Sequence, residues 1–142
     1  KQYLTLVLGN WPHGTKLIDA PLATQNRSGG ERVVKVDARG KESRSTFIPV
    51  DFFGNMATLL QVQLDTGRTH QIRVHFSAFK HPLLGDTMYG ADPTLASRLQ
   101  IDRQWLHAMR LSFMHPTSGE EVSFESSYSS DLAAVLQRLQ SN

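Results

Sequence analysis

The sequence predicts a single α+β domain with a mixed, largely antiparallel sheet flanked by helices. Short β-prone runs follow one another along the chain and are joined by turns, whereas a parallel sheet needs strands that alternate with long helices. Apolar residues recur at helical spacing in two longer segments, one near the middle and one at the C-terminus. The 142 residues, 39% of them hydrophobic, suffice for one globular unit and leave no room for a second of ordinary size.

The first half of the chain predicts strands. Residues 3–8 form an apolar, β-prone run that ends at Gly9. Two more runs cover residues 32–36 and 45–53, and the second turns at Gly54-Asn55 into residues 57–64, as in a β-hairpin. Residues 25–30, which are rich in Gly, Ser and Asn, predict a loop between strands.

The second half predicts helices and one more hairpin. Residues 69–79 form an amphipathic helix after the break at residues 66–67, and a short helix follows Asp92-Pro93. Residues 105–115 and 121–125 predict a hairpin closed by residues 116–119. The C-terminal helix begins at the capping residues Ser129, Ser130 and Asp131, and its apolar stripe consists of Leu132, Val135, Leu136 and Leu139.

Composition and charge narrow the classes of function. No apolar run approaches the roughly 18 residues of a membrane span, no secretory signal opens the chain, and there are 0 cysteines. We therefore expect a soluble, cytoplasmic protein that contacts no membrane. Residues 1–80 carry 11 Lys and Arg against 6 Asp and Glu, which makes this half the candidate surface for nucleic acid. The chain begins without methionine, which indicates a piece of a longer protein.

The densest polar stretch is residues 66–75, TGRTHQIRVH. A glycine-permitted turn leads there into a helix N-terminus, where free N–H groups and the helix dipole favour an anion. On the predicted helix, Thr69, His70 and Arg73 share one face, so Arg73 can point toward a cleft. Such an arginine needs a carboxylate or phosphate partner. A fold-stabilising ion pair remains an equal alternative for it.

The histidines do not predict a metal site. His70, His75 and His81 are five and six residues apart, whereas a helix brings together residues three or four apart. The aspartates at positions 65, 86 and 92 are interpreted as turn residues. Residue spacing alone thus indicates an anion-binding cleft without a complete set of catalytic groups.

Longer motifs resemble those of a known enzyme family. The runs LDTGRTHQIRVH (residues 64–75), HPLLGD (81–86) and Tyr89-Gly90 resemble the signature of pseudouridine synthases that modify ribosomal large-subunit RNA. Residues 1–9 are similar to the tyrosine-bearing strand of that family, residues 40–46 to its lysine-containing strand start, and residues 106–116 to its last motif. The resemblance covers nearly the whole chain and is closest to the C type.

The resemblance implies isomerisation of uridine to pseudouridine in ribosomal large-subunit RNA, with the base flipped into a cleft and no metal or organic cofactor. It implies that Tyr3 contacts the uracil, that Arg73 pairs with the catalytic aspartate and that Leu106 lies under the base. Arg68, Thr69 and His70 would bind substrate by facing phosphate or supporting the cleft. By the same resemblance, Arg73→Ala abolishes activity and leaves the fold intact.

One family feature is absent from the sequence. The catalytic aspartate of this family lies in an Arg-Leu-Asp segment before the tyrosine strand, and no such run occurs in residues 1–142. We therefore expect this chain to be the C-terminal portion of a catalytic domain. The upstream aspartate segment and any S4-like RNA-binding domain would precede Lys1. We expect this fragment to be inactive by itself. We expect the intact protein to be a monomer.

Two other functions fit the same residues. A catalytically inactive RNA-binding module could use the same basic cleft. A metal-dependent hydrolase built on His70, His75 and His81 is a distant third, because their spacing is wrong for a helical metal site.

Overall fold

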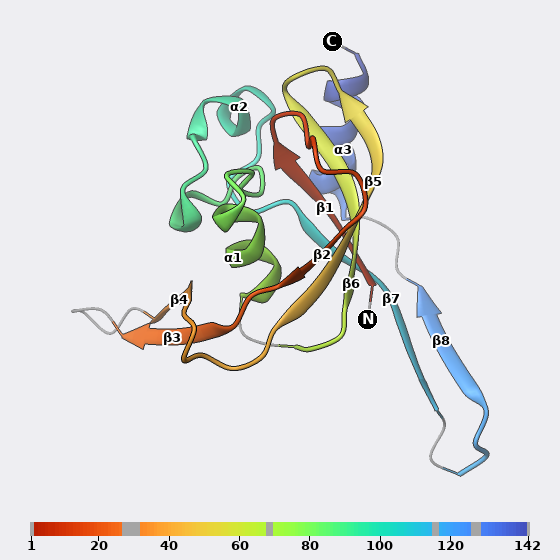
Figure 1. Ribbon diagram of the computed structural model, residues 1–142. Helices are drawn as coiled ribbons and strands as arrows, with labels where there is room; N and C mark the ends of the chain where they lie inside the picture. Colours follow the sequence, from red (N-terminus) through yellow and green to blue (C-terminus); the bar gives the residue numbers. More distant parts are fainter. Residues whose placement is uncertain (1, 27–31, 68–69, 115–116, 126–128, 142) are drawn as a thin grey trace.

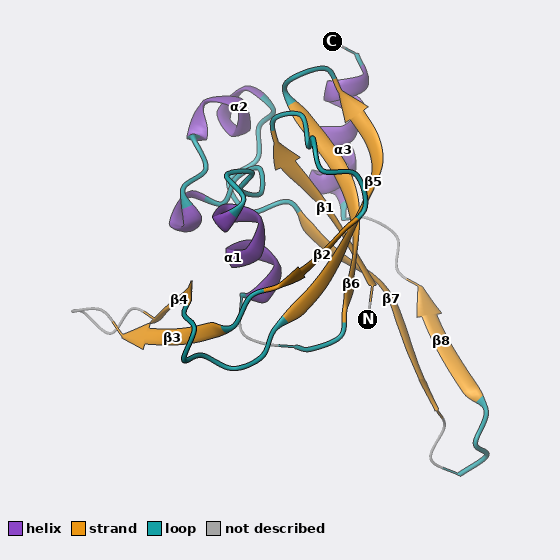
Figure 2. Ribbon diagram, viewed as in Figure 1, coloured by secondary structure: helices purple, strands orange, loops and turns teal. Residues whose placement is uncertain are grey.

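The structure, a computed structural model, describes residues 2–26, 32–67, 70–114, 117–125 and 129–141. A six-stranded sheet in the order β2-β5-β6-β1-β7-β8 forms its centre, and each described pair of neighbours is antiparallel (Figures 1 and 2). A two-stranded ribbon, β3-β4, stands apart from it. The elements are β1 (Gln2–Leu8), β2 (Lys16–Asp19), β3 (Leu22–Asn26), β4 (Arg32–Val36), β5 (Arg44–Phe53), β6 (Ala57–Leu64), α1 (Gln71–Ala78), η1 (Thr87–Tyr89), α2 (Pro93–Arg98), β7 (Leu106–Met114), β8 (Glu121–Glu125) and α3 (Ser130–Gln140).

The structure confirms the predicted α+β class and adds two strands. Strands β2 and β3 were not predicted, and β3 includes Gln25 and Asn26 of the expected loop, whose remaining residues lie outside the described part. Strand β2 is a sheet edge that buries only Ile18, so its sequence carries a weak strand pattern. Helix α1 begins at Gln71, two residues later than predicted.

Alternating residues of β1 belong to two hydrophobic layers, which lie on opposite faces of the sheet. Leu4 and Leu6 belong to the layer beneath α3, whereas Val7 belongs to the layer beneath α1, with Tyr3 packed at its margin. Because side chains alternate along a strand, one strand supplies both layers. Tyr3 is thereby placed on the α1 face.

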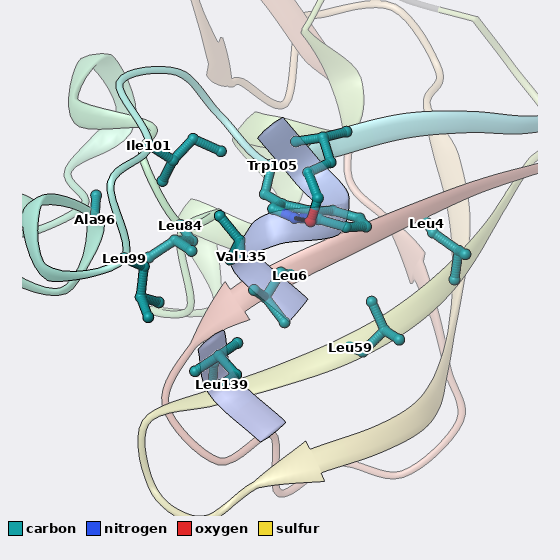
Figure 3. Packing of buried hydrophobic residues seen from close by; sticks show 12 residues of the cluster. Leu4, Leu6, Leu59, Leu84, Ala96, Leu99, Ile101, Trp105, Val135 and Leu139 are labelled. Atoms are coloured by element: carbon teal, nitrogen blue, oxygen red, sulfur yellow. Dashed lines mark hydrogen bonds between the residues drawn. The ribbon is translucent and has the colours of Figure 1, made fainter. Parts of the chain in front are cut away.

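Helix α3 closes one face through the apolar stripe that the sequence predicted. Leu132, Val135 and Leu139 are each at most 3% exposed, and Figure 3 shows members of this cluster around Trp105. The indole N–H of Trp105 donates to the main-chain oxygen of Leu132 at 3.0 Å. Burial of each aliphatic side chain stabilises the fold by about 1.5–3 kcal/mol, so α3 is fastened mainly by these contacts. Among the described residues, no helix is both long and apolar enough to cross a membrane.

A buried chain of hydrogen bonds fastens α1 to the sheet. The Gln71 amide donates to the Ser45 hydroxyl at 2.9 Å, and Ser45 Oγ lies 3.0 Å from His75 Nδ1. His75 Nε2 lies 2.9 Å from the Ala20 carbonyl oxygen, which can only accept, so the proton is on Nε2 and Nδ1 accepts from Ser45. Burial lowers the pKa of His75, and its imidazole is therefore neutral in the fold.

The lowered pKa of His75 predicts that the protein loses stability as the pH falls below about 6.5, the ordinary value for histidine. In that range His75 binds a proton in the unfolded chain but not in the folded chain, so the free energy of unfolding decreases with decreasing pH. We expect His75→Gln, whose amide can replace both hydrogen bonds, to flatten this dependence in denaturant titrations between pH 7 and 5. Part of the slope remains, because the pKa of His70 is lowered too.

The control is His13→Gln, which removes an exposed histidine. Equal slopes for the wild type and His75→Gln would contradict the assignment.

Gly85 predicts a second effect on stability. Its φ is +85°, and a Cβ there would lie 2.1 Å from the Arg103 carbonyl oxygen. At Gly54, φ is +57° and nothing lies within 4 Å of the added atom. We expect Gly54→Ala to cost about 1–2 kcal/mol for the left-handed backbone alone, and Gly85→Ala to cost clearly more in chemical denaturation. Equal decreases in the free energy of unfolding for the two variants would contradict a role for the close contact with Arg103.

Candidate active site

A cleft of about 350 Å³ opens between the start of α1 and the ends of three central strands. It lies on the α1 face of the sheet, where β6 ends and β7 begins. Its volume is within the usual range of about 300–1,000 Å³ for ligand sites. The lining side chains come from Tyr3, Leu64, His70, Gln71, Ile72, Arg73, Gln104 and Leu106.

Strand register explains why Tyr3 and Leu106 share this cleft. Leu106 is paired with Thr5 of β1, and Tyr3 lies two positions from Thr5 along the same strand. Residues two apart on a strand, and residues paired across antiparallel strands, point to the same face. Residues 103 positions apart in sequence thus meet on one wall.

Arg73 is held in the cleft wall by a buried aspartate. Its Nε donates to Asp86 Oδ2 at 2.8 Å and its Nη2 to Oδ1 at 2.7 Å, a bidentate pair. The two side chains are 12% and 1% exposed. The hydrogen bonds that Arg73 donates to Asp86 raise the pKa of Arg73, which stays charged. This is the ion pair that the sequence left open as an alternative for Arg73, and it does not use Nη1.

Asp86 owes its position to a segment that is anchored to β1. The main-chain N–H of Leu84 donates to the Leu6 oxygen at 2.8 Å, and the Trp105 N–H donates to the Leu84 oxygen at 2.9 Å. The Asp86 carbonyl then accepts from the N–H groups of Tyr89 and Ala91. Asp86 is a turn residue, as predicted, but its carboxylate also points inward. The only sequence signal for this contact with Arg73 was the position of Asp86 at the end of the HPLLGD motif.

His70 precedes α1 in an unusual conformation. Its φ is 53° and its ψ is 21°, in the left-handed region, so the helix cannot include it. The predicted helical face of Thr69, His70 and Arg73 is therefore wrong for His70. Its Nδ1 lies 2.7 Å from the Tyr89 hydroxyl. Burial, followed by the nearby charge of Arg73, lowers the pKa of His70.

Four of the predicted site residues line one cleft, namely Tyr3, His70, Arg73 and Leu106. The other two, Arg68 and Thr69, lie outside the described residues. Sequence reasoning missed Gln71 and Gln104 in the wall, together with Asp86 and Tyr89 behind it. Gln71 lies inside the motif of residues 64–75 and Gln104 just before that of residues 106–116, but neither carries a further sequence signal, because polar side chains of this kind are common on surfaces.

The cleft combines apolar walls with hydrogen-bond donors. Leu64, Ile72 and Leu106 can pack against a flat ring, and Tyr3 adds an aromatic face. Arg73 supplies a fixed positive charge. No carboxylate belongs to the lining described for the cleft, and the described residues contain no group of three or more metal-ligating side chains. The site can bind and orient a planar, hydrogen-bonding group next to an anion.

Comparison with known proteins agrees with these features. A family model described as RNA pseudouridylate synthase matches residues 1–78, which include β1 and α1. An uncharacterized RNA pseudouridine synthase of Mycobacterium bovis is 45% identical over 139 residues. Ribosomal large subunit pseudouridine synthases C of Haemophilus influenzae and Yersinia pestis are 40% and 41% identical. These alignments cover 98–100% of this chain, which spans less than half (44–45%) of each relative's length.

Solved structures share the fold. Human RNA Pseudouridylate Synthase Domain Containing 1 matches with a TM-score of 0.73 and 25% identity, over 100% of this chain and 66% of its own. Human RNA Pseudouridylate Synthase Domain Containing 4 matches with a TM-score of 0.75 and 19% identity, over 99% of this chain and 62% of its own, which supports the fold alone. Since the family model spans more than half of the residues, this chain belongs to the RNA pseudouridylate synthase family.

Proposed function

We propose that this chain forms part of an enzyme that isomerises uridine to pseudouridine in ribosomal large-subunit RNA. The observation that carries the proposal is the meeting of positions 3, 73 and 106 in one cleft. The sequence motifs single out these same positions, and they come from three separate elements. Relatives named ribosomal large subunit pseudouridine synthase C support the choice of RNA.

The proposed reaction needs a carboxylate that the described cleft lining lacks. We propose that an aspartate upstream of Lys1 supplies it and that Arg73 pairs with it. Asp86 is a poor candidate, because it is 1% exposed and both its oxygens are bonded to Arg73. The Nη1 group of Arg73, which the Asp86 pair leaves out, can meet the second carboxylate. A fixed cation keeps such a carboxylate ionised and directed.

The remaining groups then take roles around a base flipped out of the RNA. The N1–C1′ bond breaks, the uracil turns, and C5 bonds to C1′ as the C5 proton leaves and N1 gains one. Tyr3 contacts the uracil, and Leu106 packs beneath it, which offsets the cost of unstacking. His70 lies at the cleft wall with Arg68 and Thr69 preceding it in sequence, and we propose that these three support the RNA backbone or the cleft.

The first prediction concerns Arg73 and requires a paired variant. Contrary to the expectation that Arg73→Ala leaves the fold intact, this variant leaves the buried Asp86 carboxylate without its partner, at a cost of about 3–5 kcal/mol. Unfolding could then explain any loss of activity. The double variant Arg73→Gln with Asp86→Asn keeps a neutral hydrogen-bonded pair. In the intact enzyme we expect it to fold and to lose activity by at least about 10²-fold, because a charge that stabilises the reacting groups is gone. Pseudouridine formation and thermal unfolding are the measurements.

The matched control is Arg103→Gln with Asp131→Asn, which neutralises another bidentate pair, at 2.8–2.9 Å, outside the cleft. We expect activity near that of the wild type. Equal activities for the two double variants would contradict the role of Arg73.

The second prediction separates an enzyme part from an inactive RNA-binding module. The 142-residue chain should form no pseudouridine, and a protein that also carries the preceding Arg-Leu-Asp segment should form it in large-subunit RNA. Conversion of Asp to Asn in that segment should remove activity and retain RNA binding. Turnover by the 142 residues alone would place the nucleophile elsewhere, and inactivity of the longer protein would favour the binding module.

A further inference from the structure

Tyr89 lies behind the cleft wall and contacts two of the residues that line it. Its hydroxyl is 2.7 Å from His70 Nδ1, and its ring lies under the Arg73 guanidinium, 5.0 Å from centroid to Cζ. Tyr89 itself does not belong to the lining described for the cleft. Its hydroxyl also accepts a hydrogen bond from the main-chain N–H of Val34 in β4, at 3.1 Å.

The bond from Val34 constrains where the protons lie. A main-chain N–H can only donate, so the Tyr89 oxygen accepts there and its own hydrogen is available for His70 Nδ1. The 2.7 Å separation is typical of an O–H donor, whereas N–H donors are usually found near 2.9–3.0 Å. Nδ1 is then an acceptor, and in the neutral imidazole the proton is on Nε2.

The remaining ring nitrogen of His70 is Nε2. His70 lines the cleft, and Nε2 has no hydrogen-bond partner among the described residues. The lowered pKa of His70 keeps the ring neutral near pH 7, so Nε2 carries a single N–H. An N–H of this kind binds an oxygen acceptor and cannot bind another donor such as the N3–H of uracil.

We infer that Tyr89 is a positioning residue, whose hydroxyl fixes His70 so that its Nε2–H points to an oxygen acceptor of the bound RNA, a base carbonyl or a phosphate. The identity of the ligand rests on the proposed function, whereas the arrangement of Tyr89 and His70 does not. His70 has a left-handed backbone conformation, which is costly for a residue other than glycine, and this hydrogen bond joins its side chain to Tyr89 of η1. Through Val34, the same hydroxyl ties the β3-β4 ribbon to the cleft.

The first test uses Tyr89→Phe in the 142-residue chain. This variant keeps the ring under Arg73 and removes only the hydroxyl. If Tyr89 donates to Nδ1, it stabilises neutral His70, so Tyr89→Phe raises the pKa of His70 in an NMR titration. If Nδ1 donates to Tyr89 instead, removal of the hydroxyl lowers that pKa. Among the described residues, the charges that act on His70 are Arg73 and Asp86, and both remain.

In the wild type, ¹⁵N spectra should show His70 Nδ1 without a proton and Nε2 with one. Ser77→Ala is the matched control, because it removes a 2.6 Å hydrogen bond to the main-chain oxygen of Tyr89 and leaves the hydroxyl in place. Its His70 pKa should equal that of the wild type. A protonated Nδ1 in the wild type, or a His70 pKa that falls or stays constant in Tyr89→Phe, would overturn the inference.

The second test identifies the acceptor. A short RNA with one uridine and the same RNA with an abasic ribose at that position are titrated separately while the Nε2–H signal is followed. A shift with both RNAs identifies a phosphate oxygen, and a shift with the uridine RNA alone identifies a base carbonyl. A shift with neither, together with the expected pKa change, would refute the ligand assignment and with it the proposed RNA site, while Tyr89 would remain the residue that orients His70.

Discussion

The buried ion pair between Arg73 and Asp86 is the constraint on which the cleft depends. Arg73 lies in the first turn of α1, and Asp86 lies in the segment that follows the helix and is hydrogen-bonded back to β1. Two charges that are almost removed from water stay together because separation would leave each without a partner. The pair therefore fixes the start of α1 relative to the central strands, and the cleft is the space between them.

The hydrophobic layers and the polar contacts stabilise different parts of the structure around that pair. The layer beneath α3 lies on the face away from the cleft, whereas the cleft face combines the layer beneath α1 with polar groups. On that face, hydrogen bonds run from Gln71 to Ser45, from Ser45 to His75 and from His75 to Ala20, and each joins a donor to an acceptor. A fully satisfied network of this kind is rigid. This network fastens α1 through Gln71 and His75, and Asp86 fastens the same helix through Arg73.

The sequence predicted most of the fold, because strongly patterned segments need little context. The apolar stripe of α3 and the apolar, β-prone run of β1 predicted the correct elements. Strands β2 and β3 were not predicted because each buries a single apolar residue, Ile18 and Leu22, and is formed by its pairing with β5 or β4. Helix α1 starts two residues later than predicted because His70 adopts a left-handed conformation, and its side chain contacts Tyr89, which is 19 residues away in sequence.

The candidate site was only partly predictable. Family motifs singled out Tyr3, Arg73 and Leu106, and strand register with helix packing brings them together. The carboxylate partner of Arg73 could not be inferred from spacing, because Asp86 follows a turn whose inward direction is set by main-chain bonds to distant strands. Tyr89 belongs to a family motif, but its contacts with His70 and Arg73 could be found only from the fold.

The most direct test of this site is a structure of the whole protein bound to a short uridine-containing RNA. We predict that the flipped uracil lies against Tyr3 and Leu106, with Arg73 bonded to Asp86 and also to a carboxylate from upstream of Lys1. A uracil bound elsewhere, or an Arg73 that contacts Asp86 alone, would contradict it.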